Sequence, residues 1–110
     1  MILSSPTPLN PYASGTFSYT PDIYTKYSRM VAKATGQVFI DHGLYTANFY
    51  ATLPAATVNS FFPNQTIHTS EEGARVVAQA FVRGLLCGPK GGLRSSVNQP
   101  SSSVPGKCIT

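Results

Sequence analysis

Hydrophobic residues in the first part of the chain predict two short strands with a helix between them. The apolar run over residues 2–5, ILSS, is stopped by a proline-rich stretch and is typical of a buried strand. Residues 37–41, QVFID, have the same character and predict a second strand. A strand, a helix and a strand in this order form a βαβ unit, which implies a parallel pair joined by a right-handed crossover.

The helix between these strands is expected over residues 20–35. Thr20 is suited to the N-cap, Pro21 to the first turn, and Asp22 to the positive end of the helix dipole. Gly36 is typical of the position just beyond a helix C-terminus. One apolar stripe recurs at helical spacing and comprises Ile23, Tyr24, Tyr27, Met30, Val31 and Ala34.

Two further helices are expected after the second strand, the first of them over residues 43–53. Pro54 would end that helix, and residues 54–68 then predict a loop with one turn around 55–61.

The last helix is expected over residues 70–86. Thr69 and Glu72 have the spacing of a capping box. Gly73 and Gly84 are each expected to weaken the helix by about 1 kcal/mol relative to alanine. Its buried face is predicted to comprise Val76, Val77, Ala80, Phe81 and Leu85.

Residues 88–110 are rich in glycine, proline and serine and predict a loop or tail after the folded part, 1–87. The two cysteines, Cys87 and Cys108, lie at the two ends of this segment. A disulfide between them would contribute roughly 3 kcal/mol on the chain-entropy estimate. Two free thiols, as in a cytosolic protein, are the alternative.

The predicted elements do not close a complete α/β layer structure. Parallel sheets are normally covered on both faces and contain several strands. Two strands with three helices leave a sheet edge and much apolar surface exposed. The pattern therefore indicates a missing partner, either another chain or an N-terminal half of the same fold.

Composition narrows the functional classes. Of the 110 residues, 42% are hydrophobic and only 11% are charged, which is typical of secreted proteins with an ordered core. The net charge of +4 comes from scattered lysines and arginines, whereas a nucleic-acid interface usually clusters them. An acidic polysaccharide suits this basic balance better. Two cysteines cannot supply a four-ligand zinc site, so we expect no metal.

We expect neither a membrane-spanning segment nor a signal peptide in these 110 residues. No stretch approaches the ~20 apolar residues of a membrane span. The first residues, MILSSPTPLNPY, lack the basic start and long apolar run of a signal peptide.

His68 is the first candidate for chemistry, because it stands directly before the last helix. The positive end of that helix favours the neutral imidazole that a general base needs. A surface histidine bonded to a loop is the alternative. His42, after the second strand, could line the strand-end face where α/β ligand sites lie. Asp41 is the one carboxylate without an evident structural role and could orient His68 if the fold brings them together.

No serine stands in a nucleophile context, because the chain contains neither G-x-S-x-G nor Gly-Asp-Ser. Ser4 and Ser5 end a strand that is followed by proline rather than by a helix. Asn64 begins a glycosylation sequon, NQT, and a glycan there would crowd His68.

Four stretches together carry a family resemblance, and they run in order over nearly the whole chain: ILSSPTPLNPY, VFIDHGLY, ATVNSFFPNQTIHTSEEGARVVAQAFVRGLLC and the final KCI. They resemble the C-terminal portion of fungal rhamnogalacturonan acetylesterases, which are SGNH (GDSL-type) hydrolases. The spacing of the two cysteines agrees with this resemblance.

The resemblance implies a partial three-layer α/β/α, flavodoxin-like fold and a secreted serine esterase that deacetylates the rhamnogalacturonan of pectin without a cofactor. The family's last catalytic block is Asp-x-x-His. Its histidine falls on His68, and its aspartate falls on Gln65, which carries no charge. The nucleophile and oxyanion blocks have no counterpart here.

Two functional hypotheses follow. The first is a truncated acetylesterase-like chain that acts on acetylated pectic polysaccharide by resemblance and is inactive alone. The second is a small non-catalytic binding or interaction protein built on the half-fold, with self-association through the open sheet edge as one form.

Overall fold

The computed structural model describes residues 1–88, 93–98 and 103–109. In chain order, the elements are β1 (Ile2–Ser4), α1 (Ile23–Thr35), β2 (Val38–Ile40), α2 (His42–Tyr50), α3 (Ala55–Ser60), α4 (Glu71–Leu86) and the short 3-10 helix η2 (Arg94–Ser96). The predicted α/β class is therefore confirmed, and the predicted turn around 55–61 is the helix α3.

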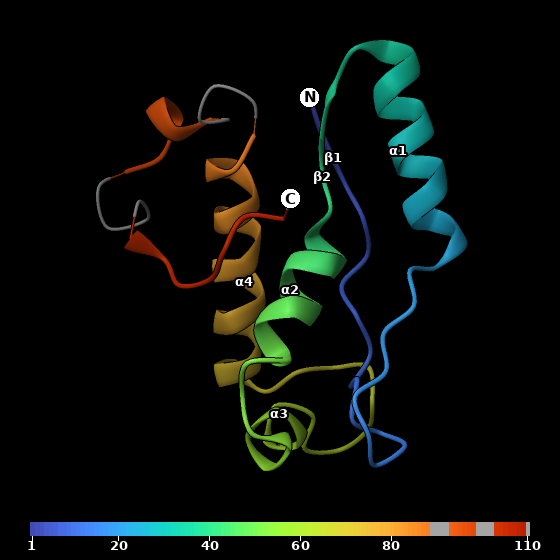
Figure 1. Ribbon diagram of the computed structural model, residues 1–110, viewed down its shortest axis with the longest axis vertical. Coiled ribbons are helices and arrows are strands. Elements are labelled where there is room, and N and C mark those ends of the chain that lie inside the picture. The colour runs from blue at the N-terminus through green and yellow to red at the C-terminus, as the bar shows by residue number, and fades with distance from the viewer. Residues whose placement is uncertain (89–92, 99–102, 110) are drawn as a thin grey trace.

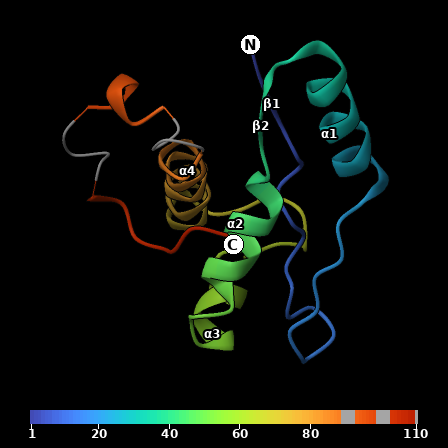
Figure 2. The same cartoon turned by 45° about the horizontal axis from the view of Figure 1, so that its top comes forward.

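The sheet has two parallel strands, as predicted from the βαβ pattern. Ile2 lies opposite Val38, and Ser4 lies opposite Ile40. The backbone N–H of Ser5 extends the pairing by donating to the carbonyl of Ile40 at 3.1 Å. Helix α1 lies on one side of the strands and α4 lies on the other, while α2 follows from the end of β2 and packs against α4 (Figures 1 and 2). This layering is consistent with part of an SGNH-like fold.

Helix α1 begins two residues later than expected. The predicted N-cap at Thr20 is wrong, since Asp22 fills that position and its Oδ1 accepts from the backbone N–H of Thr25 at 3.0 Å. Asp22 is the better cap because the same oxygen also accepts the Thr25 hydroxyl. Gly36 ends the helix with φ of 68°, in the left-handed region that glycine adopts without strain.

The apolar stripe of α1 faces solvent. Thr25 and Ala32 are the buried residues of this helix, so its contact with the sheet is made by small side chains. The large residues of the stripe are between 49% and 64% exposed, and they are Ile23, Tyr24, Tyr27, Met30 and Val31. The expected exposure of apolar surface is therefore present, and α1 carries much of it.

Helix α4 begins at Glu71 with Ser70 as its N-cap, so the predicted capping box on Thr69 is wrong. The Ser70 hydroxyl accepts from the backbone N–H of Gly73 at 3.2 Å. A Cβ at Gly73 would lie 2.8 Å from Cβ of Phe61 and 2.9 Å from Cβ of Thr69. The glycine thus lets the preceding loop pack against the first turn of the helix.

Gly84 has a similar function near the other end of α4. A Cβ there would lie 2.4 Å from Cγ2 of Ile40 on β2. Because real Cβ atoms do not approach that closely, alanine at this position would push α4 away from the sheet. The sequence pattern indicated only a helix-weakening glycine, whereas the structure uses it for close packing.

The main core cluster lies at the α2–α3 end of the molecule and consists of Tyr50, Val58, Phe61, Phe62 and Val76. Within the described residues, the buried hydroxyl of Tyr50 has no hydrogen-bond partner, and burial raises its pKa to about 12. Phe61 and Phe62 belong to the segment that leads to His68. The core therefore anchors one end of that segment.

A disulfide joins Cys87, which follows α4, to Cys108, with 5.4 Å between their Cα atoms. This settles the choice between a disulfide and free thiols. The backbone N–H of Ile109 donates to the hydroxyl of Tyr45 at 3.3 Å, and Arg83 donates to backbone carbonyls of 104 and 105. The end of the chain is thus held against α2 and α4.

Candidate functional site

His68 lies on the loop of residues 61–70, between α3 and α4. Both halves of this loop are fixed by backbone hydrogen bonds. Ser70 N–H donates to the carbonyl of Phe61 at 2.7 Å, and Asn10 N–H donates to the carbonyl of Thr66 at 2.9 Å. The His68 side chain is presented at the surface from a loop with a defined backbone.

Gln65 is in direct contact with His68. Its carbonyl oxygen, Oε1, accepts from the backbone N–H of Ile67 at 2.7 Å and from that of His68 at 3.3 Å. The amide nitrogen, Nε2, then faces Nδ1 of the His68 ring and forms a hydrogen bond with it. Two backbone donors on Oε1 fix which end of the amide is oxygen, because an NH₂ group there could accept neither of them.

This orientation determines the tautomer of the His68 ring. An amide nitrogen donates, so Nδ1 of the neutral imidazole must accept and the ring proton must be on Nε2. A triad histidine needs the reverse, with Nδ1–H donating to a carboxylate and Nε2 free to take a proton. The Gln65–His68 pair therefore holds the ring in the form that is unsuited to a general base.

Asn64 precedes this pair and is exposed at a bend of the same loop. The sequon is thus accessible, although its occupancy stays a prediction.

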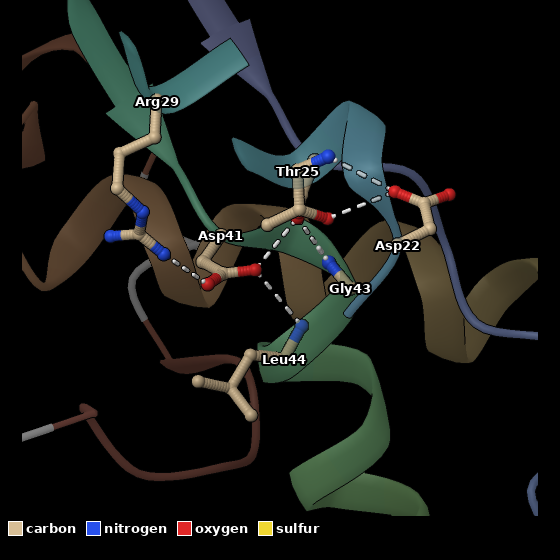
Figure 3. A network of polar contacts seen from close by, with 7 residues as sticks. Asp22, Thr25, Arg29, Asp41, Gly43 and Leu44 are labelled. Atoms are coloured by element: carbon tan, nitrogen blue, oxygen red, sulfur yellow. Dashed lines mark hydrogen bonds and ion pairs between the residues drawn. The ribbon is translucent and has the colours of Figure 1, made fainter. Parts of the chain in front are cut away.

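Asp41 lies between β2 and α2 and is fully engaged in structure (Figure 3). Its Oδ1 accepts from the Ser5 hydroxyl at 2.7 Å and from the backbone N–H of Leu44 at 3.3 Å, which makes it the N-cap of α2. Its Oδ2 pairs with the Arg29 guanidinium at 2.9 Å. The expectation that Asp41 lacks a structural role is wrong, and its contacts are with these groups and not with His68.

Ser5 is buried and bonded in both directions. Its hydroxyl donates to Asp41, and its oxygen accepts from the backbone N–H of Gly43 at 2.9 Å. A Cβ at Gly43 would lie 2.4 Å from the carbonyl oxygen of Pro6, so the first turn of α2 packs tightly over this serine. A hydroxyl enclosed in this way is a structural link between strand and helix and has no room for a substrate.

Tyr19 lies beside the same network. Its hydroxyl oxygen would lie 2.6 Å from a Cβ at Gly43. Burial, and then the negative charges of Asp41 and Asp22, raise the pKa of Tyr19 to about 12. The phenol therefore stays protonated at neutral pH and acts as a neutral neighbour of both carboxylates.

His42, the first residue of α2, turns away from the strand ends. Its Nε2 lies 2.7 Å from the carbonyl oxygen of Val77, and its ring packs edge-on against Phe81 with centroids 5.2 Å apart. Because a carbonyl only accepts, Nε2 carries the proton. Burial lowers the pKa of His42, and the hydrogen bond to Val77 opposes this effect. His42 joins α2 to α4 and does not line an open site.

Sequence reasoning did not identify the structural roles of Asp41, Ser5 and His42, which link strand to helix and helix to helix. A local signal was available for Asp41 alone. An aspartate directly before a helix that begins at His42 is in the N-cap position, from which its side chain can accept from the backbone N–H of Leu44.

The described residues hold no group of three histidine, cysteine or acidic side chains that could bind a metal ion. A cavity of about 460 Å³ is lined by residues from the 6–25 segment, and one of about 480 Å³ lies between α2, α4 and residues 105–108. Neither is lined by His68 or Gln65. Among the helices that the structure describes, none is long and apolar enough to cross a membrane.

Comparison with known proteins supports the resemblance. No family model matches the chain. A rhamnogalacturonan acetylesterase of Emericella nidulans is 48% identical over 87 residues, which are 79% of this chain and 36% of that enzyme. The chain thus spans little more than a third of the relative's length. Over most of its residues, this chain is homologous to part of a rhamnogalacturonan acetylesterase.

Proposed function

We propose that this chain is the histidine-bearing part of a rhamnogalacturonan acetylesterase-like serine ester hydrolase and that it is inactive on its own. His68 is the proposed catalytic histidine, and Gln65 stands where the family resemblance expects the orienting aspartate. The observation that carries the proposal is the Gln65–His68 contact in a loop of a chain that is 48% identical to such an enzyme.

Two features support inactivity of the isolated chain. Ser5, the buried serine beside an aspartate, donates to Asp41 and has no histidine as a base. Gln65 carries no charge to stabilise the imidazolium that forms when a serine is deprotonated. Loss of the carboxylate from a serine-hydrolase triad can reduce the rate by about 10⁴.

The proposed substrate is an acetylated rhamnogalacturonan, from the name of the relative, and the family resemblance implies that it belongs to pectin. Export from the cell is proposed with it, and the disulfide between Cys87 and Cys108 suits an oxidising compartment.

The test is hydrolysis of p-nitrophenyl acetate and of acetylated rhamnogalacturonan by the purified chain. We expect the rate to equal that of His68→Ala at every pH. Turnover that depends on His68 would contradict the proposed inactivity. The role of His68 itself is tested in a complex in which another chain supplies the serine nucleophile. If His68→Ala leaves the activity of that complex unchanged, the catalytic assignment of His68 is contradicted.

A second function is favoured by one observation, the exposed apolar face of α1. A non-catalytic interaction protein would bind a partner through that face without chemistry at His68. Binding that is insensitive to His68→Ala and Gln65→Ala would favour this alternative.

A further inference from the structure

We infer that the cavity between α2, α4 and the end of the chain is a binding site for a carboxylate-bearing sugar ring, a hexuronate. We call it the tail pocket, and its volume is about 480 Å³. The inference goes beyond the proposed function, because neither His68 nor Gln65 lines this pocket and its ligand would bind without being hydrolysed. Its lining includes Tyr45, Asn48, Phe49, Thr52, Arg83 and Lys107.

Size and enclosure make the tail pocket suitable for a small ligand. Pockets that bind small molecules typically measure about 300–1,000 Å³, so a single sugar ring with its hydroxyl groups fits this volume. Three segments enclose the pocket: α2, α4 and residues 105–108. In Figure 1 the red trace of residues 103–109 crosses α4 and reaches α2, so the end of the chain forms one wall.

This wall is held in place before any ligand binds. The disulfide between Cys87 and Cys108 ties it to the end of α4. The backbone N–H of Ile109 donates to the Tyr45 hydroxyl at 3.3 Å, which ties it to α2. Arg83 donates to the backbone carbonyls of residues 104 and 105. Because the wall is already ordered, a ligand loses little binding free energy to ordering the pocket.

The charge of the tail pocket favours an anion. The charged side chains that line it, within the described part of the chain, are both cations, Arg83 and Lys107. Its lining contains none of the four acidic side chains of the chain, which are Asp22, Asp41, Glu71 and Glu72. The bonds of Arg83 to the tail carbonyls fix the position of its charge in advance. A bound carboxylate would therefore meet positive charge without a competing acidic side chain.

The opposite wall favours a sugar ring. Tyr45, Asn48 and Phe49 lie on one face of α2, and Thr52 follows just beyond its end. The two aromatic side chains offer apolar contact to the C–H groups of a sugar ring. The amide of Asn48 and the hydroxyl of Thr52 can donate to and accept from its hydroxyl groups. Together the two walls match a ring that carries both hydroxyls and a carboxylate.

The experiment titrates galacturonate into the nitrogen-15-labelled 110-residue chain, with the disulfide intact, and follows the amide resonances by NMR. We expect saturable shifts at the Asn48 side-chain amide and at the backbone amides of residues 106–108. Galactose has a CH₂OH group in place of the carboxylate and should bind at least about 10-fold more weakly. Acetate supplies the carboxylate without the ring and should also bind at least about 10-fold more weakly.

Variants at exposed positions test the two walls without disturbing the core. Lys107→Gln should weaken galacturonate binding roughly three-fold and leave galactose binding unchanged. Asn48→Ala should weaken the binding of both sugars roughly five-fold. Lys26→Gln, at an exposed lysine of α1, is the matched charge control and should leave the affinity unchanged. Circular dichroism of each variant excludes loss of fold.

Three outcomes would overturn the inference. The first is the absence of saturable shifts with galacturonate. The second is binding of galactose or acetate as tight as that of galacturonate, where the acetate result would indicate an adventitious anion contact only. The third is a set of shifts confined to the loop of His68 that His68→Ala abolishes. Hydrolysis is not the readout, so failure here would leave the proposed function untouched, and an inactive chain would leave the tail pocket intact.

Discussion

One histidine of this chain begins a helix and the other lies three residues before one, yet their surroundings are opposite. His42 is half-buried, bonded to the carbonyl of Val77 and packed against Phe81. His68 is exposed, and among the described residues the Gln65 amide is the side chain that forms a hydrogen bond with its ring. In both, the ring proton is placed on Nε2, but by a carbonyl in one case and by an amide nitrogen in the other.

The comparison shows that a histidine near a helix start has no fixed role. A histidine that follows a strand becomes part of the helix–helix packing, because the chain turns directly from β2 into α2 through Asp41. A histidine on a loop held by Asn10 and Phe61 keeps its ring in solvent. Only the second could meet a substrate, and there the neighbour at position 65 determines what the ring can do.

The largest expected effect is on the network around Asp41. Asp41→Ala removes the N-cap of α2 and leaves the buried Ser5 hydroxyl without its acceptor. We expect a loss of about 3 kcal/mol in the free energy of unfolding, measured by urea denaturation. Asp22→Ala, which removes the cap of α1, should cost only about 1 kcal/mol. Equal costs would show that the Asp41 network adds nothing to an ordinary cap.

Gly84 is expected to rank next. Gly84→Ala should reduce the free energy of unfolding by about 2 kcal/mol, because the new Cβ would meet Cγ2 of Ile40 at 2.4 Å. Gly→Ala in an open helix stabilises by about 1 kcal/mol instead, so the sign alone is decisive. Ala78→Gly, at an exposed position of α4, is the control. It measures the difference in helix propensity between alanine and glycine without any contact to Ile40.

The pH dependence of stability tests the buried environment of His42. Because the folded state lowers the pKa of His42, the unfolded chain binds more protons below the ordinary pKa of 6.5. Stability is therefore fully present above about pH 6.5 and falls as the pH drops below it. Thermal unfolding of the wild type and His42→Gln between pH 5 and 8 should show this slope in the wild type alone.

A slope that persists unchanged in His42→Gln would contradict the assignment of this pH dependence to His42.

The smallest effect on stability, and the most specific one, concerns Gln65. Nitrogen-15 chemical shifts of the His68 ring should report the Nε2–H tautomer in the wild type and the Nδ1–H tautomer in Gln65→Asp, with unfolding free energy changed by less than about 0.5 kcal/mol. Thr66→Ser serves as a control within the loop. An Nδ1–H tautomer in the wild type would remove the structural basis for a disabled histidine.

Much of the fold could be predicted because its signals are local. Hydrophobic periodicity identified α1 and α4, the apolar runs identified both strands, and the strand–helix–strand order predicted their parallel pairing. Helix starts were misassigned by one or two residues at Thr20 and Thr69, since several residues in a row could cap and only packing selects among them.

The candidate site was predictable in part. The position of His68 and Gln65 three residues apart follows from the family resemblance, and their contact agrees with it. The N-cap function of Asp41 has a local signal, but its bonds to Ser5 and Arg29 were not predictable, because these residues lie 36 and 12 residues away along the chain. Such long-range contacts leave no periodic trace in a single sequence.

The disulfide has a further consequence for how this chain would be seen after proteolysis. Cys87 and Cys108 enclose the stretch that follows α4, with a sequence separation of 21 residues. A cut anywhere between them would add one water to the mass without releasing the last residues. Such a nicked chain would migrate as one band on a gel until a reducing agent separated it into two.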